Sequence, residues 1–191
     1  PEAATQKVTA WDLGMSDSTA IWVAEMISGE VRVMDFYEAS GESLDHYIKW
    51  LDEKGYRDYT HIMPHDVNVR ELQTGKSRYQ FLTEAGLDIE VAPKSSVEDG
   101  IQAVRRILPN CWFNKDKTRA GVECLQNYRR VFNEKTSSFQ NRPLHDWSSH
   151  AADAFRYLAL GMDSTGNGQR TDWSKPFETT LDGDSYKDYY V

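Results

Sequence analysis

The sequence is short of the features that mark secreted and membrane proteins. It contains only two cysteines, Cys111 and Cys124, which lack both metal-binding spacing and the density of a disulfide framework. We therefore expect an intracellular, reducing setting. No apolar run approaches the ~18–20 residues that a helix needs to span a bilayer, so no membrane segment is predicted.

Positive charge is also in deficit. The chain has 22 Lys and Arg residues against 30 Asp and Glu residues, which gives a formal net charge of −8. This balance argues against a simple basic nucleic-acid binder. It does not exclude an enzyme that acts on nucleic acid, because a site built of carboxylates carries negative charge that bound Mg²⁺ or Mn²⁺ offsets.

With 191 residues and no internal repeat, the chain is long enough for one domain with a full core. We expect residues 1–6 to be a linker or disordered start and residues 7–163 to be the folded domain. Residues 164–191 lose periodicity and indicate a polar C-terminal tail. Because the sequence begins at Pro1 rather than Met, we expect a fragment or a processed product.

The most informative stretch is residues 8–14, Val-Thr-Ala-Trp-Asp-Leu-Gly. It alternates apolar and polar residues as a strand does, and a polar turn and a second strand follow it. Asp12 is the anomaly, because strands disfavour Asp and a central strand would bury it. A buried carboxylate needs a partner, a proton or a metal. The alternative is that Asp12 only forms the turn.

The remaining pattern predicts an α/β domain. Strands at 7–14, 19–27 and 31–37 form an antiparallel meander. The elements predicted after them are a helix at 43–54, a strand at 59–66, a helix at 76–86, a strand at 87–91, a helix at 96–108, a strand at 111–113 and helices at 119–130 and 147–161. Residues 131–146 are less regular and hold either a hairpin or a mobile loop. The fourth strand should pair parallel to the first and bring Asp66 near Asp12.

The last predicted helix carries a carboxylate beside small residues. Asp153 lies between Ala152 and Ala154, which would let the helix approach the sheet closely. Its apolar face consists of Ala151, Ala154, Phe155, Leu158 and Ala159. We also expect five tryptophans to be core residues rather than base-stacking platforms, namely Trp11, Trp22, Trp50, Trp112 and Trp147.

This order of elements is the ribonuclease H-like arrangement, a mixed sheet of three antiparallel strands followed by parallel strands and flanked by helices. Three segments, WDLGMSDSTAIW, PHDVNV and HDWSSHAADAFRYLALG, resemble the nuclease domain of the large terminase subunit of tailed double-stranded DNA bacteriophages. The resemblance covers residues 7–162. Its most specific part is the Ser-His-x-Ala-Asp-Ala-x-Arg-Tyr pattern of the last helix.

The resemblance implies a part of a genome-packaging motor. In that family an N-terminal ATPase is followed by a nuclease that cuts concatemeric viral DNA before and after a capsid is filled. This sequence has no G-x-x-x-x-G-K-[ST] phosphate-binding loop, so it would be the nuclease half. The implied partners are double-stranded DNA, the ATPase domain of the same full-length chain, the portal and the small terminase subunit. The implied location is the host cell cytoplasm, away from any membrane.

The resemblance also implies the site. Asp12, Asp66 and Asp153 would be the catalytic ligands of two Mg²⁺ or Mn²⁺ ions about 3.5–4 Å apart, which stabilise attack and departure in phosphodiester hydrolysis. Asp12 would bridge both ions, and Asp66 and Asp153 would hold one each. Asp17 is a fourth candidate ligand, or else a turn residue bonded to its own backbone.

Three further residues are expected to support these ligands: His65, Asp146 and His150. His150 lies three residues before Asp153 on the same helix face, so it could orient Asp153, touch the scissile phosphate or cap the helix. His65 stands beside Asp66 and either supports it or is solvated. Zinc is disfavoured, because no His pair has zincin spacing and carboxylates favour Mg²⁺ or Mn²⁺.

Basic residues that could contact DNA phosphates without reading sequence occur after Asp66 and in the second half of the chain. They are Arg70, Lys76, Arg78, Arg105, Arg106, Lys115, Lys117, Arg119, Arg129 and Arg130. The alternative for each is a solvated surface position.

Three other classes of protein compete with this interpretation. Junction resolvases, integrases, transposases and ribonuclease H share the three-acid logic, but the last-helix pattern fits terminase better. An actin-like ATPase also opens with a strand bearing Asp-x-Gly, yet it needs a duplicated domain and 191 residues are too few. A non-catalytic docking module for the portal or small terminase is disfavoured by the presence of all three acids.

Overall fold

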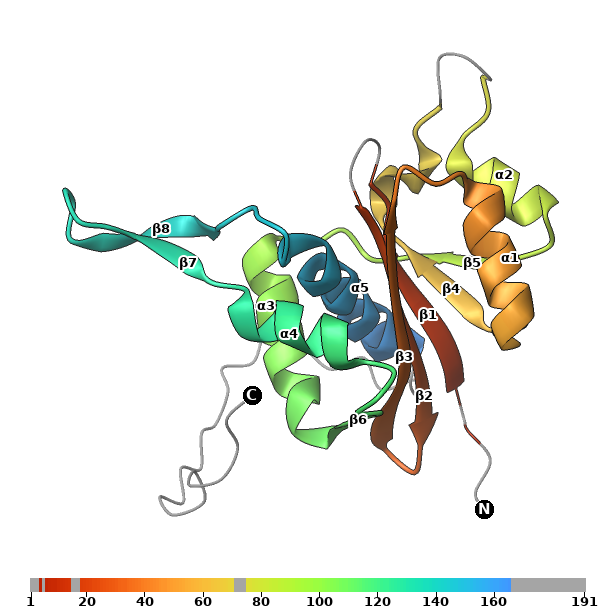
Figure 1. The fold of residues 1–191 in the computed structure, drawn as a ribbon, viewed down its shortest axis with the longest axis horizontal. Coiled ribbons are helices and arrows are strands. Elements are labelled where there is room, and N and C mark those ends of the chain that lie inside the picture. Colours follow the sequence, from red (N-terminus) through yellow and green to blue (C-terminus); the bar gives the residue numbers. More distant parts are fainter. Residues whose placement is uncertain (1–3, 5, 15–17, 71–74, 166–191) are drawn as a thin grey trace.

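The structure, a computed structural model, describes residues 4, 6–14, 18–70 and 75–165 (Figure 1). A six-stranded sheet lies at the centre, in the order β5-β4-β1-β2-β3-β6. Its strands are β1 (Gln6–Asp12), β2 (Ser18–Ile27), β3 (Glu30–Ser40), β4 (Thr60–Met63), β5 (Asp88–Val91) and β6 (Cys111–Phe113). The helices are α1 (Leu44–Lys54), α2 (Arg78–Glu84), α3 (Val97–Ile107), α4 (Arg119–Asn127) and α5 (Ser149–Thr165), with short 3₁₀ turns η1 (His65–Asn68) and η2 (Leu108–Asn110).

The strand pairing confirms the predicted mixed α/β sheet. β1, β2 and β3 are antiparallel neighbours, whereas β4 pairs parallel to β1 and β5 pairs parallel to β4. At the other edge, β6 pairs parallel to the first part of β3. β1 and β4 therefore point in the same direction, and the residues that follow these two strands lie at the same end of the sheet.

Helices cover both faces of the sheet, with α1 and α2 on one side and α3, α4 and α5 on the other (Figure 1). The buried apolar residues form two clusters, one on each face of the sheet, and β1 contributes side chains to both. Val8 and Ala10 pack with Trp22 and Phe155 under α5, while Trp11 packs with the α1 side. Residues 8–11 of β1 are buried between these helices. Asp12 is the last residue of the strand and its only acidic one.

α5 packs closely against the sheet, as the small residues around Asp153 predict. The apolar face expected from the sequence is entirely buried. Gly161 lies directly over Ile62 of β4, and a Cβ added at this glycine would stand 2.5 Å from Ile62 Cδ1. A side chain at residue 161 would thus push the helix away from β4.

A buried polar chain fixes β1 against β4. Trp11 Nε1 donates to Thr9 Oγ1 at 2.7 Å, and Thr9 Oγ1 lies 2.7 Å from His61 Nδ1. His61 Nε2 lies 3.1 Å from the carbonyl oxygen of Arg57. Since a carbonyl only accepts, Nε2 carries the proton and Nδ1 accepts from the threonine hydroxyl. Burial lowers the pKa of His61, and the bond to Arg57 opposes that shift.

Two local predictions are wrong. The strand expected at 59–66 ends at Met63, and Asp66 lies in η1, because Pro64 has no N–H with which to continue a ladder. Trp112 and Trp147 are exposed, at 61% and 59%, whereas Trp11, Trp22 and Trp50 are buried as expected. An apolar side chain at the start of a helix or on an edge strand is not forced inward by periodicity alone.

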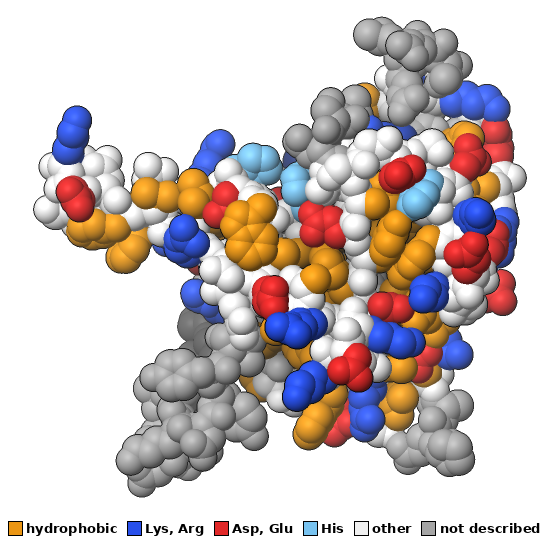
Figure 2. All heavy atoms as spheres, viewed as in Figure 1, with side chains coloured by type: hydrophobic (Ala, Val, Ile, Leu, Met, Phe, Trp, Pro, Cys, Tyr) orange, Lys and Arg blue, Asp and Glu red, His pale blue; other side chains and the backbone are white. Residues whose placement is uncertain are grey.

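Residues 131–146 contain a hairpin, one of the two predicted alternatives. It consists of β7 (Arg130–Asn133) and β8 (Ser138–Pro143), which pair antiparallel and project from the body of the molecule (Figure 1). Hydrophobic atoms are visible along it in Figure 2. Phe132 and Phe139 contact each other with ring centroids 5.1 Å apart and are 49% and 62% exposed.

Both cysteines are free thiols. Burial raises the pKa of Cys111 to about 12 and that of Cys124 to about 11, so both stay protonated at neutral pH. Among the helices that the structure describes, none has the length and apolarity needed to cross a membrane.

Candidate active site

The site is organised around Asp12, the last residue of β1. Its side chain is 19% exposed, and the Nδ1 atom of His150 donates to Asp12 Oδ2 at 2.9 Å. Burial raises the pKa of Asp12, the charge of Asp153 raises it further, and the bond with His150 opposes both. Asp12 is therefore a carboxylate whose charge is disfavoured by burial and by a like charge, and which is held by one histidine.

Asp153 stands one helical turn after His150 on α5. Arg156 donates to its Oδ1 atom from Nε at 3.1 Å and from Nη2 at 2.8 Å. The Arg156 side chain is 8% exposed, and Gly100 of α3 makes room for it, since a Cβ there would lie 3.0 Å from an Arg156 nitrogen. The ion pair fixes the Asp153 carboxylate from the protein side and leaves it 26% exposed.

Two tyrosines border the pair of carboxylates. The hydroxyl of Tyr128, which follows α4, lies 3.4 Å from Asp153 Oδ1, and burial together with the Asp153 charge raises the pKa of Tyr128 to about 12. Burial raises the pKa of Tyr157 to about 12, with smaller contributions from Asp12, Asp153 and Asp66. The charges of all three predicted acids thus contribute to raising the pKa of one tyrosine at this end of the sheet.

Asp66 lies beyond the end of β4, in the 3₁₀ turn η1. It is exposed to solvent. Within the described ranges, no three His, Cys, Asp or Glu side chains converge closely enough to hold a metal ion. Asp12 and Asp153 are close enough for the charge of Asp153 to raise the pKa of Asp12, whereas Asp66 is exposed.

No family model matches the sequence, and no curated protein does. Solved structures do. The chain is similar to the large terminase of a thermophilic bacteriophage, solved in several crystal forms and also with ADP. The identity is 17% and the TM-score 0.64, over 85% of this chain and 41% of that one. This chain therefore spans less than half the length of that protein.

Two isolated nuclease domains are also similar over most of their length. The first is the large terminase nuclease domain of bacteriophage SPP1 with bound Mn, at 16% identity, a TM-score of 0.58, and 80% and 84% coverage of the two chains. The second is the large terminase nuclease of the thermophilic phage G20c with bound magnesium, at 13% identity, a TM-score of 0.57, and 81% and 80% coverage. This chain has the fold of a terminase nuclease domain. The ribonuclease H-like fold class predicted from the sequence is confirmed.

The remaining acidic and histidine candidates occupy different parts of this terminase-nuclease fold. Asp17 lies outside the described residues. His65 is exposed beside Asp66. Asp146 precedes α5 and accepts from the hydroxyl of Ser148 at 2.6 Å and from its N–H at 2.9 Å, which lowers the pKa of Asp146. Asp146 thus orders the start of the helix that carries His150 and Asp153.

The basic candidates divide by their distance from Asp12. Arg78 is near it, because its Nη1 atom donates to the carbonyl oxygen of Leu13 at 3.3 Å. A backbone β-bridge joins Arg70 to Ser77, the residue before Arg78. Lys76 forms an ion pair with Glu84, with 2.7 Å between Nζ and Oε2. Arg105 and Arg106 lie in the last turn of α3. Arg129 and Arg130 follow Tyr128, which reaches Asp153.

Lys115, Lys117 and Arg119 lie farther away. They follow β6, which ends opposite Val33, whereas Asp12 is level with Glu38 through Ala20. The last residue of β6 is therefore about 17 Å along the sheet from the level of Asp12. β6 is the edge strand beside β3, so β2 and β3 separate it from β1 and Asp12.

Sequence reasoning missed Arg156, Tyr128 and Tyr157 as site residues. Arg156 and Tyr157 belong to the pattern that carried the resemblance, and Arg156 has the i,i+3 spacing from Asp153 that predicts a helical ion pair. Nothing local marks Tyr128, since its contact with Asp153 depends on how α4 packs against α5.

Proposed function

We propose that this chain is the nuclease domain of a phage large terminase subunit. It cuts concatemeric double-stranded DNA with little sequence specificity, as a metal-dependent endonuclease. One observation supports this above the others: Asp12 and Asp153 share a half-buried position at the carboxyl edge of a terminase-nuclease sheet. Residues 7–163 are the proposed nuclease domain.

The donor set fits a hard divalent cation. Asp12 and Asp153 offer carboxylate oxygens, which Mg²⁺ and Mn²⁺ prefer, and the like charge that raises the pKa of Asp12 is what a cation between them would neutralise. Asp66 would complete the set from the rim, with Asp17 as a further candidate, in a site for two ions. When bound, such cations offset phosphate charge and lower the pKa of an attacking water.

The chain's own residues orient these ligands. His150 holds the Asp12 carboxylate, and Arg156 holds Asp153 on the side away from solvent. Because Arg156 is buried in the body of the domain, it balances Asp153 without competing for the exposed face of that carboxylate. Arg78, anchored on the Leu13 carbonyl, lies where it can meet a phosphate at Asp12.

The wider role belongs to the full-length protein. We propose that an ATPase domain of the same chain moves the DNA and that the portal and small terminase subunit are its partners in the host cell cytoplasm. The length of the similar large terminase, of which this chain covers 41%, supports a second domain.

The test is cleavage of supercoiled plasmid by the purified domain with Mn²⁺ or Mg²⁺. We expect nicked and linear products that disappear with EDTA and in Asp12→Asn. Asp116→Asn, which removes an exposed carboxylate beyond β6, should cut like the wild type. Intact plasmid under every metal condition, with the isolated domain and with the full-length protein alike, would overturn the proposal in favour of a docking module.

A further inference from the structure

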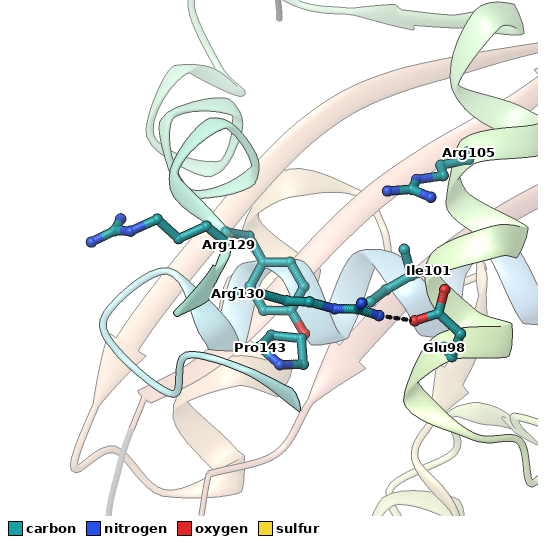
Figure 3. Close-up of a pocket in the computed structure, with 7 residues that line it drawn as sticks. Glu98, Ile101, Arg105, Arg129, Arg130 and Pro143 are labelled. Carbon is teal, nitrogen blue, oxygen red and sulfur yellow. Dashed lines mark hydrogen bonds and ion pairs between the residues drawn. The ribbon is translucent and has the colours of Figure 1, made fainter. Parts of the chain in front are cut away.

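A pocket of about 290 Å³ opens between α3 and the base of the β7–β8 hairpin (Figure 3). Its walls come from two segments that are far apart in the sequence. The lining residues are Glu98, Ile101, Arg105, Tyr128, Arg129, Arg130 and Pro143. Three arginines and one glutamate line this cavity, which gives it a net positive charge in a chain whose net charge is −8.

The arginines are arranged differently. In Figure 3, Arg105 extends from α3 and Arg130 reaches across from β7 toward Glu98, whereas Arg129 points away from the pocket. Arg130 forms an ion pair with Glu98. Arg105 is exposed, and no ion pair joins it to another residue that the structure describes. The pocket thus holds one arginine that is paired with an acid and one that faces solvent.

The pocket adjoins the carboxylate site through a single side chain. Tyr128 lines the pocket, and its hydroxyl reaches Asp153 Oδ1 at 3.4 Å. Successive phosphates of a DNA strand rise about 3.4 Å along the helix axis. A strand whose scissile phosphate lies at Asp12 and Asp153 would bring a neighbouring phosphate toward Tyr128, which also lines the pocket.

We propose that this pocket binds a backbone phosphate of the DNA strand being cut, an inference that rests on the proposed nuclease function. Arg105 and Arg130 supply planar guanidinium groups, each of which can donate two parallel hydrogen bonds to the oxygens of one phosphate. When DNA is absent, Arg130 is paired with Glu98, and the incoming phosphate replaces Glu98 as the partner of Arg130. Glu98 is thus a competitor for the same arginine and limits affinity.

The face of the molecule shown in Figure 2 is not broadly basic. On the face shown in Figure 2, Lys and Arg side chains are interspersed with Asp and Glu rather than gathered in a broad basic area. Such a surface gives little long-range steering of DNA. The position of the strand then depends on short-range contacts beside the acids, and the arginine pocket provides them.

The test measures binding of a labelled DNA duplex of about 20 base pairs to the domain in EDTA, by fluorescence anisotropy between about 50 and 200 mM salt. We expect Arg105→Ala to weaken binding about tenfold and to reduce the salt dependence by about one phosphate contact. Glu98→Gln should tighten binding about threefold, because it frees Arg130. Thermal unfolding of each variant checks that it is folded.

Lys115→Ala is the matched control, since it removes one exposed positive charge after β6, the edge strand that β2 and β3 separate from β1. It should leave the affinity and the salt dependence close to those of the wild type. Equal effects of Arg105→Ala and Lys115→Ala, a Glu98→Gln variant that binds no tighter, or a wild type that does not bind would each overturn the proposal.

The two proposals fail separately. If plasmid is never cut but Arg105→Ala weakens binding and Glu98→Gln strengthens it, the pocket stands and the nuclease assignment falls. If plasmid is cut and neither variant changes binding, only the pocket proposal falls.

Discussion

Asp153 and Arg156 form an ion pair that is buried on the side of the arginine. Removing a charged group from water costs free energy that its partner must return, so the loss of one partner leaves the other uncompensated. Arg156 is 8% exposed and Asp153 is 26% exposed. The pair therefore contributes to stability as well as to the orientation of a proposed metal ligand.

We expect Arg156→Met to lower the free energy of unfolding by about 3 kcal/mol, because Asp153 loses its partner in a poorly solvated position. Urea unfolding measures this. Arg119→Met is the control, since Arg119 is 81% exposed and its pair with Glu123 should contribute no more than about 0.5 kcal/mol. Equal losses in the two variants would show that the Arg156 pair has no special role in stability.

His61 gives the protein a pH-dependent stability. Its folded pKa lies below the ordinary value near 6.5, because the ring is buried. The unfolded chain thus binds more protons below pH ~6.5. The contribution of His61 is complete above that pH and is lost as the pH falls below it.

Urea unfolding between about pH 8 and 5 tests this prediction. The free energy of unfolding should fall as the pH drops below ~6.5, in addition to the effects of other groups, because the unfolded state binds the extra proton. His61→Gln should have a lower stability at pH 8 and a shallower slope below pH ~6.5. Parallel curves for the two proteins would contradict the assignment of this pH dependence to His61.

At the scale of elements, the contact of α5 with β4 determines how near the carboxylates of the last helix come to the sheet. Gly161 permits that contact, since any Cβ would meet Ile62. Helix propensity alone favours alanine over glycine by about 1 kcal/mol, so propensity and packing oppose each other at this position.

We expect packing to win, so that Gly161→Ala destabilises the domain by about 1–3 kcal/mol. The double variant Gly161→Ala with Ile62→Val removes the Cδ1 atom at 2.5 Å and should recover part of that loss. Chemical denaturation of the two single variants and the double variant gives the coupling. A Gly161→Ala protein that is more stable than the wild type would contradict the close approach.

The order of elements can be predicted from sequence because alternation in β1 to β3 and the apolar face of α5 are local signals. The meander, the parallel pairing of β4 and the buried face of the last helix are confirmed. The predicted end of β4 is wrong, since the polar residues after Pro64 look alike in a strand end and in a 3₁₀ turn.

At the scale of the whole molecule, the site depends on contacts between distant segments. Asp12 and Asp153 stand out in the sequence as acids beside apolar residues, but their partners do not. Tyr128 reaches Asp153 because α4 packs against α5, and Arg105 faces Arg130 because the hairpin base lies beside α3. The hydrophobic pattern of one segment does not predict contacts with a distant segment, which depend on how the elements pack together.

The central claim is that Asp12 and Asp153 bind a divalent cation together. The most direct measurement is a crystal of the domain soaked in Mn²⁺, with the metal located from its anomalous scattering. We predict a peak about 2.1 Å from an oxygen of Asp12 and from an oxygen of Asp153, absent in Asp12→Asn. Manganese bound only elsewhere, or no peak beside Asp12 in the wild type, would contradict the account.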